Sequence, residues 1–244
     1  MKRLLKISFA RNEVVLWAVS VSLITGSFLL FDRSGYMPLT ASLIGVTSLI
    51  FNAKGHPFGQ LLMVVFSALY GYLSLIQAYY GEMITYLGMT APMALAAFIT
   101  WIRYPYSGDS AEVAVNRIRR REVFFMLALT ALVTLVFYFV LAAFDTAHLF
   151  LSTLSVTTSF IAVYLTFRRN PGFALAYAAN DLVLVALWWL AAETDRSCLS
   201  VVICFAMFFI NDLYGFFSWL RMQKRQIARE KSRNGSCTDR IHHV

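Results

Sequence analysis

Long apolar runs separated by short polar stretches make up most of this chain. Eight runs are each close to the roughly 20 residues that an α-helix needs to cross a bilayer core. They cover residues 14–31, 36–53, 58–80, 84–102, 122–144, 149–167, 173–192 and 198–220. We therefore expect an all-α membrane protein with eight transmembrane helices, the fourth of them kinked by Pro92.

The composition supports a membrane protein and excludes several other classes. Of the 244 residues, 59% are hydrophobic and only 14% are charged, whereas a soluble domain has about 25% charged residues. Such a chain is too apolar for intrinsic disorder or for a water-soluble fold. Cys198 and Cys204 lie in the last apolar run and Cys237 in a polar tail, so we expect no disulfide framework.

The basic residues set the orientation of the predicted helices. If the N-terminus is cytoplasmic, all 21 Lys and Arg residues except Arg33 and Arg196 fall in cytoplasmic segments. This asymmetry follows the positive-inside rule and predicts that both termini are cytoplasmic. The same rule, with attraction to the anionic lipids of the bilayer, accounts for the net charge of +8. We therefore expect no nucleic-acid partner.

Short motifs recur in the two halves of the chain. Residues 47–50 (TSLI) recur as residues 158–161 (TSFI), and residues 101–103 (WIR) recur as residues 219–221 (WLR). Each motif has the same position within a unit of three apolar runs. A single helix between the units restores their orientation, so the two repeats are parallel. Transporters with such repeats bind substrate between them, near the bilayer midplane.

This repeat predicts how the chain is divided. The segments are a cytoplasmic N-terminus (1–13), an extra N-terminal helix (14–31), a three-helix repeat (36–102), a linker helix (122–144), a second three-helix repeat (149–221) and a basic cytoplasmic tail (222–244). Because the tail is polar and basic from about residue 226, we expect it to be disordered.

Two acidic residues lie deep within the predicted membrane helices. Asp181, next to Asn180, is in the middle of the seventh run, and Asp212, next to Asn211, lies well inside the eighth. A charged residue at the centre of a membrane helix costs about 2.5–3.5 kcal/mol on insertion scales, and no run contains Lys or Arg. Each acid must be protonated, hydrogen-bonded, or in contact with water or substrate. The alternative is that the Asn-Asp pairs hold helices together.

Aromatic and hydroxyl side chains complete a candidate substrate site. Rings stack on a flat heterocycle and attract a cationic one, while amides and acids bind the hydroxyl groups of an attached sugar. Tyr70 and Tyr177 lie too deep for the aromatic belt at the membrane surface. The candidate substrate-binding residues are Asn180, Asp181, Asn211, Asp212, Tyr214, Tyr70, Tyr177, Trp188, Thr158, Ser159, Thr47 and Ser48.

No catalytic or metal-binding pattern is visible in the sequence. His56, His148, His242 and His243 lie outside the middle of any run and lack ligand spacing with Cys or carboxylate residues. The sequence has neither a phosphate-binding loop nor a Ser-His-acid set. We therefore expect no enzyme activity, no metal and no cofactor.

Several motifs resemble those of the PnuC vitamin transporter family. They are residues 80–93 (YGEMITYLGMTAPM), 157–160 (TTSF), 178–181 (AAND) and 211–216 (NDLYGF), and the resemblance extends over about residues 35–225. It implies a transporter of nicotinamide riboside in the bacterial plasma (inner) membrane, of a type often described as a nicotinamide mononucleotide transporter. It also implies a core of three, one and three helices similar to that of SWEET sugar transporters.

The resemblance carries further expectations about mechanism. Family members are thought to work by facilitated diffusion, with a cytosolic kinase that traps the product, and relatives carry thiamine or riboflavin. Nicotinamide riboside members have tryptophans one and two turns before the asparagine that matches Asn180, where this chain has Phe173 and Ala176, next to Tyr177. Either Tyr177 and Phe173 rebuild the stacking wall or the substrate differs.

The residues and the resemblance together predict a uniporter for nicotinamide riboside that feeds NAD synthesis. Without cations in the helices, the doubly anionic phosphate of the mononucleotide fits poorly. The alternatives are the same fold carrying thiamine or riboflavin, a proton-coupled symporter in which Asp181 titrates, and a membrane-bound enzyme or assembly subunit. The sequence does not decide whether the chain forms a homo-oligomer.

Overall fold

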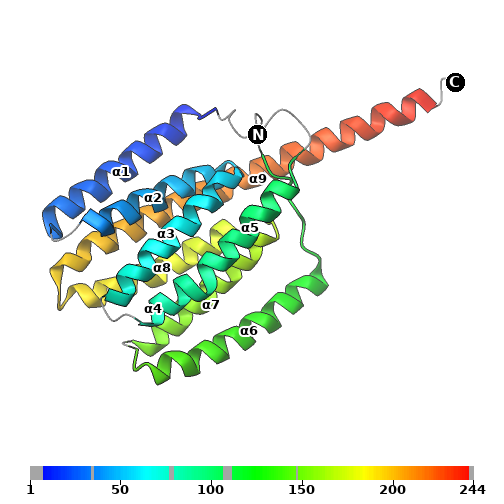
Figure 1. Ribbon diagram of the computed structural model, residues 1–244. Coiled ribbons are helices and arrows are strands. Elements are labelled where there is room, and N and C mark those ends of the chain that lie inside the picture. The colour runs from blue at the N-terminus through cyan, green and yellow to red at the C-terminus, as the bar shows by residue number, and fades with distance from the viewer. Residues whose placement is uncertain (1–7, 34–35, 77–79, 107–111, 147, 242–244) are drawn as a thin grey trace.

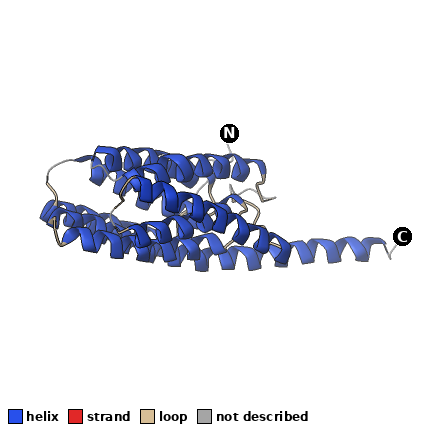
Figure 2. Cartoon of the chain, turned by 90° about the horizontal axis from the view of Figure 1, so that it is seen from below, coloured by secondary structure: helices blue, strands red, loops and turns tan. Residues whose placement is uncertain are grey.

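A bundle of helices is seen in the computed structural model, which describes residues 8–33, 36–76, 80–106, 112–146 and 148–241 (Figure 1). In chain order the elements are α1 (Arg11–Phe31), α2 (Tyr36–Ala53), α3 (Pro57–Ile76), α4 (Tyr80–Ile84), the π-helical segment η2 (Thr85–Thr90), α5 (Ala91–Arg103), α6 (Arg120–Ala143), α7 (Leu149–Phe167), α8 (Gly172–Ala192), the 3-10 turn η3 (Arg196–Cys198) and α9 (Leu199–Ile241). Figure 2 shows α9 continuing past the end of the bundle.

The helix bounds agree with the eight apolar runs. In the described part of the chain, eight helical stretches are long and apolar enough to cross a membrane; α4, η2 and α5 together form the fourth, and η3 with the first part of α9 forms the eighth. No strand occurs within the described ranges, so the all-α prediction is confirmed. α1 and α6 begin a few residues earlier than expected, because their charged first turns are also helical.

The fourth span is irregular close to where the sequence predicts a kink. Pro92 lies in the first turn of α5, where its missing N–H needs no partner, while its ring crowds the turn before it. That turn is η2, in which the Thr90 hydroxyl donates to the Thr85 carbonyl at 3.2 Å. Short π-helical segments within α-helices are frequent at functional sites, and Tyr86 of η2 is buried in the main core.

The tail after the eighth span is not disordered as expected, because α9 continues as a helix to Ile241. The Gln226 side chain anchors its first turns: its Oε1 accepts the Val115 N–H at 2.9 Å, and its Nε2 donates to the Val113 carbonyl at 3.0 Å. Arg225 also forms an ion pair with Glu112. These contacts with the central loop hold the start of the tail, which the composition alone predicted to be disordered. Residues 1–7 and 242–244 of the two termini lie outside the described residues.

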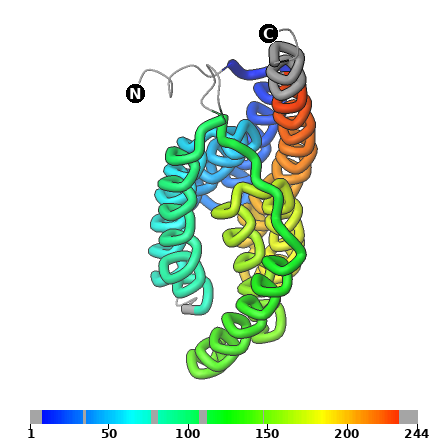
Figure 3. Tube along the Cα trace, turned by 90° about the vertical axis from the view of Figure 1, so that its right-hand side faces the viewer, coloured from blue at the N-terminus to red at the C-terminus, as the bar shows by residue number. Residues whose placement is uncertain are grey.

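α1 and α6 lie at opposite edges of the bundle (Figures 1 and 3). Among the described elements, α6 packs against α7 and more weakly against α4, whereas α1 packs against α2, α9 and η3. Large apolar side chains of α6 point outward, including Phe124 and Phe139. A helix with so little of its apolar surface covered by protein requires lipid around it.

Loops rich in basic residues gather at one end of the bundle, which we call the basic side. It comprises the start of α1, the loops 54–56 and 168–171, and the described residues of the loop 104–119. The Val113 N–H donates to the Gly55 carbonyl, and the Asn116 N–H donates to the Arg169 carbonyl, each at 3.0 Å. The central loop therefore ties the turn after α2 to the turn after α7. Gly55 and Arg169 both have a positive φ, of 65° and 57°.

Two buried tryptophans next to the basic side make equivalent hydrogen bonds to the carbonyl groups of other helices. Trp101 of α5 donates its indole N–H to the Thr166 carbonyl of α7 at 3.0 Å, and Trp219 of α9 donates to the Asn52 carbonyl of α2 at 2.7 Å. Each of these carbonyls also accepts the N–H of the positive-φ residue that follows its helix. The indole centroids are 5.3 Å apart. Thus α5 is joined to α7, and α9 to α2, by the same kind of bond.

We expect Trp219→Phe to destabilise the fold. The phenyl ring keeps part of the packing, but the buried bond to the Asn52 carbonyl is lost and a small cavity remains, which together cost about 1–3 kcal/mol. The midpoint of thermal unfolding in detergent should therefore fall. Trp189→Phe is the control, because Trp189 of α8 is 57% exposed. An equal loss of stability in the control would contradict the assignment.

Candidate functional site

Asp181 of α8 and Asp212 of α9 face each other in the interior of the bundle. Their carboxyl groups lie within hydrogen-bonding reach of each other, and the two residues are 4% and 5% exposed. Asp181 Oδ2 is buried without a hydrogen-bond partner among the described residues. Two neighbouring carboxyl groups in a membrane interior without a basic partner are a candidate site for a proton, a hydrogen-bond donor or a cationic ligand.

Asn180 is bound to α7 through its side-chain carbonyl. Its Oδ1 accepts hydrogen bonds from the hydroxyls of Thr158 at 2.9 Å, Ser159 at 3.0 Å and Ser155 at 3.2 Å. The structure thus brings together three of the predicted site residues and adds Ser155, which the sequence did not single out. Because Oδ1 is occupied, the amide NH₂ is the part of Asn180 that can donate to a ligand.

Asn211 and Tyr214 point toward α1 rather than toward α8. Asn211 Nδ2 donates to Ser20 Oγ at 2.9 Å and to the Met207 carbonyl at 2.7 Å. The Tyr214 hydroxyl donates to Glu13 Oε1 at 3.3 Å. Both side chains therefore hold α9 against α1, as the helix-joining alternative for the Asn-Asp pairs proposes. Asn211 Oδ1 is buried and has no hydrogen-bond partner among the described residues.

The side chains of Thr47 and Ser48 form hydrogen bonds within α2, and Thr47 also binds a side chain of α1. Thr47 Oγ1 donates to the Leu43 carbonyl at 2.7 Å and accepts the Trp17 indole N–H at 3.1 Å. Ser48 Oγ donates to the Gly45 carbonyl at 2.7 Å. Although Thr158 and Ser159 occupy the matching places in the repeated motif, the structure does not bring Thr47 and Ser48 to the Asn180 cluster.

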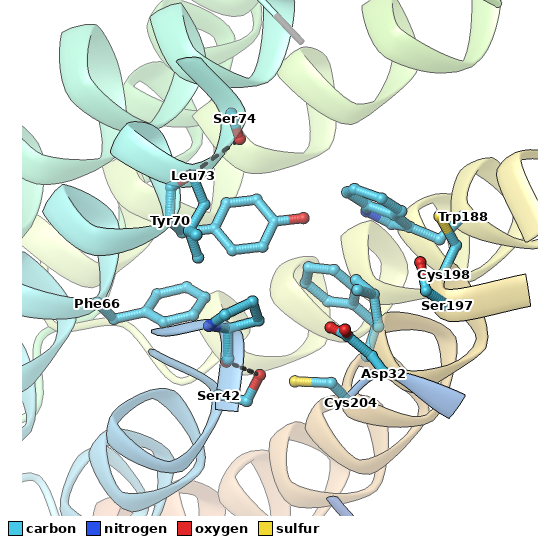
Figure 4. A pocket seen from close by; sticks show the side chains of 13 residues that line it. Asp32, Ser42, Phe66, Tyr70, Leu73, Ser74, Trp188, Ser197, Cys198 and Cys204 are labelled. Atoms are coloured by element: carbon cyan, nitrogen blue, oxygen red, sulfur yellow. Dashed lines mark hydrogen bonds between the residues drawn. The ribbon is translucent and has the colours of Figure 1, made fainter. Parts of the chain in front are cut away.

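A cavity of about 50 Å³ lies between α3, α8, α9 and the start of α2, toward the side opposite the basic side. Its lining includes Asp32, Phe66, Tyr70, Trp188 and Cys204. Figure 4 shows the Tyr70 hydroxyl pointing across the cavity toward Trp188. The space admits a few water molecules, whereas pockets for drug-sized ligands measure about 300–1,000 Å³. The helices must therefore separate before a larger ligand can enter.

Aromatic rings surround Tyr70 at this cavity. The Tyr70 centroid lies 4.6 Å from Tyr86, 5.6 Å from Phe66, 6.0 Å from Phe205 and 6.4 Å from Trp188. We call these five residues the aromatic box. The sequence predicted Tyr70 and Trp188 but missed the other three. The apolar character of Phe66 and Phe205 is common to most of the chain, and the direction of Tyr86 depends on the π-helical turn.

Glu82 is a further polar residue that the sequence did not single out. Its carboxyl group lies beside the Tyr70 hydroxyl. Both carboxyl oxygens are buried without a hydrogen-bond partner among the described residues, and so is the Tyr70 hydroxyl. Tyr86 lies close to both Glu82 and Asp181. Acidic groups from α4 and α8 are therefore both near Tyr86 of the aromatic box.

Phe173 belongs to the tryptophan contact and not to the aromatic box. It is 2% exposed, with its ring centroid 4.9 Å from Trp219 and 6.3 Å from Trp101. Tyr177 lies 6.3 Å from Phe173 and close to Asp212. Tyr177 therefore links the acidic pair to the tryptophans. The proposed stacking wall of Phe173 and Tyr177 would have to form next to the basic side.

The described residues contain no group of three or more His, Cys, Asp or Glu side chains that could hold a metal ion. The interior instead offers acids, an amide, hydroxyl groups and rings. Such groups suit the reversible binding of a small polar molecule with an aromatic part. Eight apolar helices that enclose these groups are typical of a multi-pass membrane transporter.

Comparison with known proteins agrees with this class. A sequence model described as nicotinamide mononucleotide transporter matches residues 35–221. The chain belongs to this family of membrane transporters of small molecules, and so the resemblance seen in the sequence is confirmed.

The chain is also similar to individual members. Two proteins named nicotinamide riboside transporter PnuC match it. The one from Neisseria mucosa is 25% identical over 200 residues, which are 80% of this chain and 76% of that protein. The one from Haemophilus influenzae is 21% identical over 191 residues, 78% of this chain and 81% of that protein. A crystal structure described as the vitamin B3 transporter PnuC shares the fold, with a TM-score of 0.80, 22% identity, and coverage of 92% of this chain and 97% of the other.

We expect Asn180→Ala to destabilise the contact between α7 and α8. Three hydroxyls lose a shared buried acceptor, a loss of about 1–3 kcal/mol. Thermal unfolding in detergent measures the effect. Leu182→Ala is the matched control on the same helix, because Leu182 is 53% exposed. If both variants unfold at the wild-type temperature, the hydroxyl cluster contributes nothing to stability.

Proposed function

We propose that this chain is a uniporter that imports nicotinamide riboside across the bacterial plasma membrane for NAD synthesis. The observation that carries the proposal is the buried acidic pair Asp181 and Asp212 near aromatic rings, in apolar runs that contain no Lys or Arg. Nicotinamide riboside offers a cationic pyridinium ring for the acids and rings, and ribose hydroxyls for the Asn180 amide. Two similar proteins carry the name of this transporter.

The same chemistry favours the riboside over the mononucleotide. A phosphate monoester carries about −1.5 to −2 charges at neutral pH, and none of the eight apolar runs contains Lys or Arg. Burying such an anion next to Asp181 and Asp212 would be strongly unfavourable. We therefore propose the riboside as substrate, although the family description names the mononucleotide.

We further propose that residues 36–102 and 149–221 are parallel three-helix repeats of a SWEET-like fold, with 14–31 as the extra helix and 122–144 as the linker. The equivalent hydrogen bonds of Trp101 and Trp219 support this arrangement. Each bond joins the third helix of one unit to the first helix of the other. Alternating access would then be a rocking of one unit against the other. The site would open alternately to the two sides of the membrane.

The proposal also covers the orientation of the protein in the membrane and the fate of the transported substrate. The asymmetry of the basic residues favours a cytoplasmic basic side and cytoplasmic termini. A uniporter only equalises concentrations, so net uptake needs a step that removes the product. A cytosolic kinase would do so by adding a phosphate, and the phosphorylated product would not return through a site without cations.

The binding of the two nucleotide precursors tests the proposed substrate. Purified protein in detergent should bind nicotinamide riboside, and should bind the mononucleotide at least about tenfold more weakly. Asp212→Asn and Asn180→Ala should each weaken binding of the riboside by about tenfold, because each loses a buried polar contact. Leu182→Ala serves again as control. Equal affinity for the riboside and the mononucleotide would contradict the proposal.

Thiamine and riboflavin are the second candidates for the substrate. The observation that favours them is Phe173, which stands where nicotinamide riboside members have a tryptophan and is packed against Trp101 and Trp219. Competition of each vitamin against labelled nicotinamide riboside distinguishes the candidates. We expect displacement only by unlabelled riboside; tighter binding of thiamine or riboflavin would reassign the vitamin while leaving the fold unchanged.

Proton coupling is the second candidate mechanism, because Asp181 and Asp212 are two buried carboxyl groups that could exchange a proton. Proteoliposomes that contain equal substrate concentrations on both sides separate it from uniport. When a pH gradient is imposed, a uniporter should produce no uphill accumulation. Accumulation that collapses with a protonophore would establish symport instead.

A further inference from the structure

Glu82 lacks a partner of opposite charge. Both carboxyl oxygens are buried and make no hydrogen bond within the described ranges. No Lys or Arg occurs in the runs 58–80 or 84–102 that flank Glu82, nor in the other six runs. Asp181 is the other acid close to Tyr86, and its carboxyl group lies beside that of Asp212. Glu82 is therefore an acid without a basic partner among the described residues, and such groups in membrane proteins mark substrate or ion sites.

The surroundings of Glu82 suit a cationic aromatic ring. The Tyr70 hydroxyl is beside the carboxyl group, and Tyr86 is near it. These two rings have centroids 4.6 Å apart, and Phe205 and Trp188 add two further faces next to Tyr70. The negative faces of aromatic rings attract a cation within about 6 Å of the centroid. Rings and a carboxylate at one place thus favour a positive charge that is spread over a flat ring.

Glu82 does not line the cavity itself, but its neighbour Tyr70 does. Tyr70, Phe66, Trp188 and Phe205 line the cavity of about 50 Å³, and the Tyr70 hydroxyl, which borders Glu82, points across it (Figure 4). Glu82 also directly precedes the π-helical turn Thr85–Thr90. Such turns are frequent at functional sites, and this one carries Tyr86 of the aromatic box.

We propose that Glu82 is the counter-ion for the cationic aromatic ring of the transported molecule, and that Glu82 with the aromatic box makes the transporter select a charged ring over a neutral one. The proposal rests on the proposed function, since it deepens the recognition of nicotinamide riboside. It assigns the ring to Glu82, Tyr70 and Tyr86, and leaves the sugar hydroxyls to the Asn180 region. Ring charge, and not ring shape alone, then determines affinity.

Nicotinamide riboside and its 1,4-dihydro form test this selectivity. The two molecules share the ribose and the carboxamide, but only the oxidised form carries the pyridinium charge. Equilibrium binding of both to the purified full chain in detergent should show a preference of wild type for the cationic form. Glu82→Gln keeps the shape and removes the charge. It should weaken binding of the cationic form by about tenfold or more and change binding of the neutral form by less than about twofold.

Two further variants separate charge from structure. Glu82→Asp retains a carboxylate and should keep part of the preference for the cationic form. Glu193→Gln is the matched control, because Glu193 lies exposed at the end of α8, outside the cavity lining; it should bind both forms as wild type does. If Glu82→Gln fails to fold, the proposal is still tested by wild type alone, since equal affinity for the two forms overturns it.

The remaining outcomes distinguish this proposal from the proposed function. If Glu82→Gln loses both ligands equally, Glu82 has a structural role and the proposal is wrong, while nicotinamide riboside remains the substrate. If wild type binds neither form but binds thiamine, whose thiazolium ring is cationic, and Glu82→Gln abolishes that binding, the counter-ion role holds and the vitamin is reassigned. Binding of the neutral riboflavin alone would overturn both.

Discussion

Carboxyl groups buried in helices without basic partners constrain the rest of this structure. Asp181, Asp212 and Glu82 lie among apolar helices whose eight runs contain no Lys or Arg. A membrane interior tolerates such groups only when protons, hydrogen bonds, water or a ligand satisfy them. Asp181 and Asp212 lie beside each other, whereas Glu82 lies beside Tyr70 and near Tyr86. The cationic substrate that we propose would satisfy these acids.

The two ends of the bundle are held in different ways. Next to the basic side, Trp101 and Trp219 bind helix carbonyls across the bundle, and the central loop ties Gly55 to Arg169. Toward the opposite side, rings of the aromatic box meet without hydrogen bonds between them and leave a small cavity. The cavity therefore lies at the end of the bundle where ring contacts, rather than hydrogen bonds between helices, hold the helices together.

The sequence predicted the features that depend on residues close together along the chain. Helix number and approximate bounds follow from apolar length, and Asn180 with Thr158 and Ser159 follows from polar side chains at matching depth in adjacent helices. The sequence did not predict contacts between segments that are far apart along the chain. One example is Asn211, which binds Ser20, 191 residues away. Thr47 repeats the motif of Thr158 but accepts the Trp17 indole of α1 instead. Glu82 lies between two apolar runs, and its place beside the Tyr70 hydroxyl is a tertiary contact that composition does not reveal.

The central claim is that this chain carries nicotinamide riboside across a bilayer without an energy source. The most direct test is counterflow in proteoliposomes that contain the purified chain, no kinase and no ion gradient. Vesicles loaded with unlabelled nicotinamide riboside should take up external labelled riboside transiently above equilibrium, and the mononucleotide inside should not support this exchange. If labelled riboside enters no faster than into vesicles without protein, the claim is wrong.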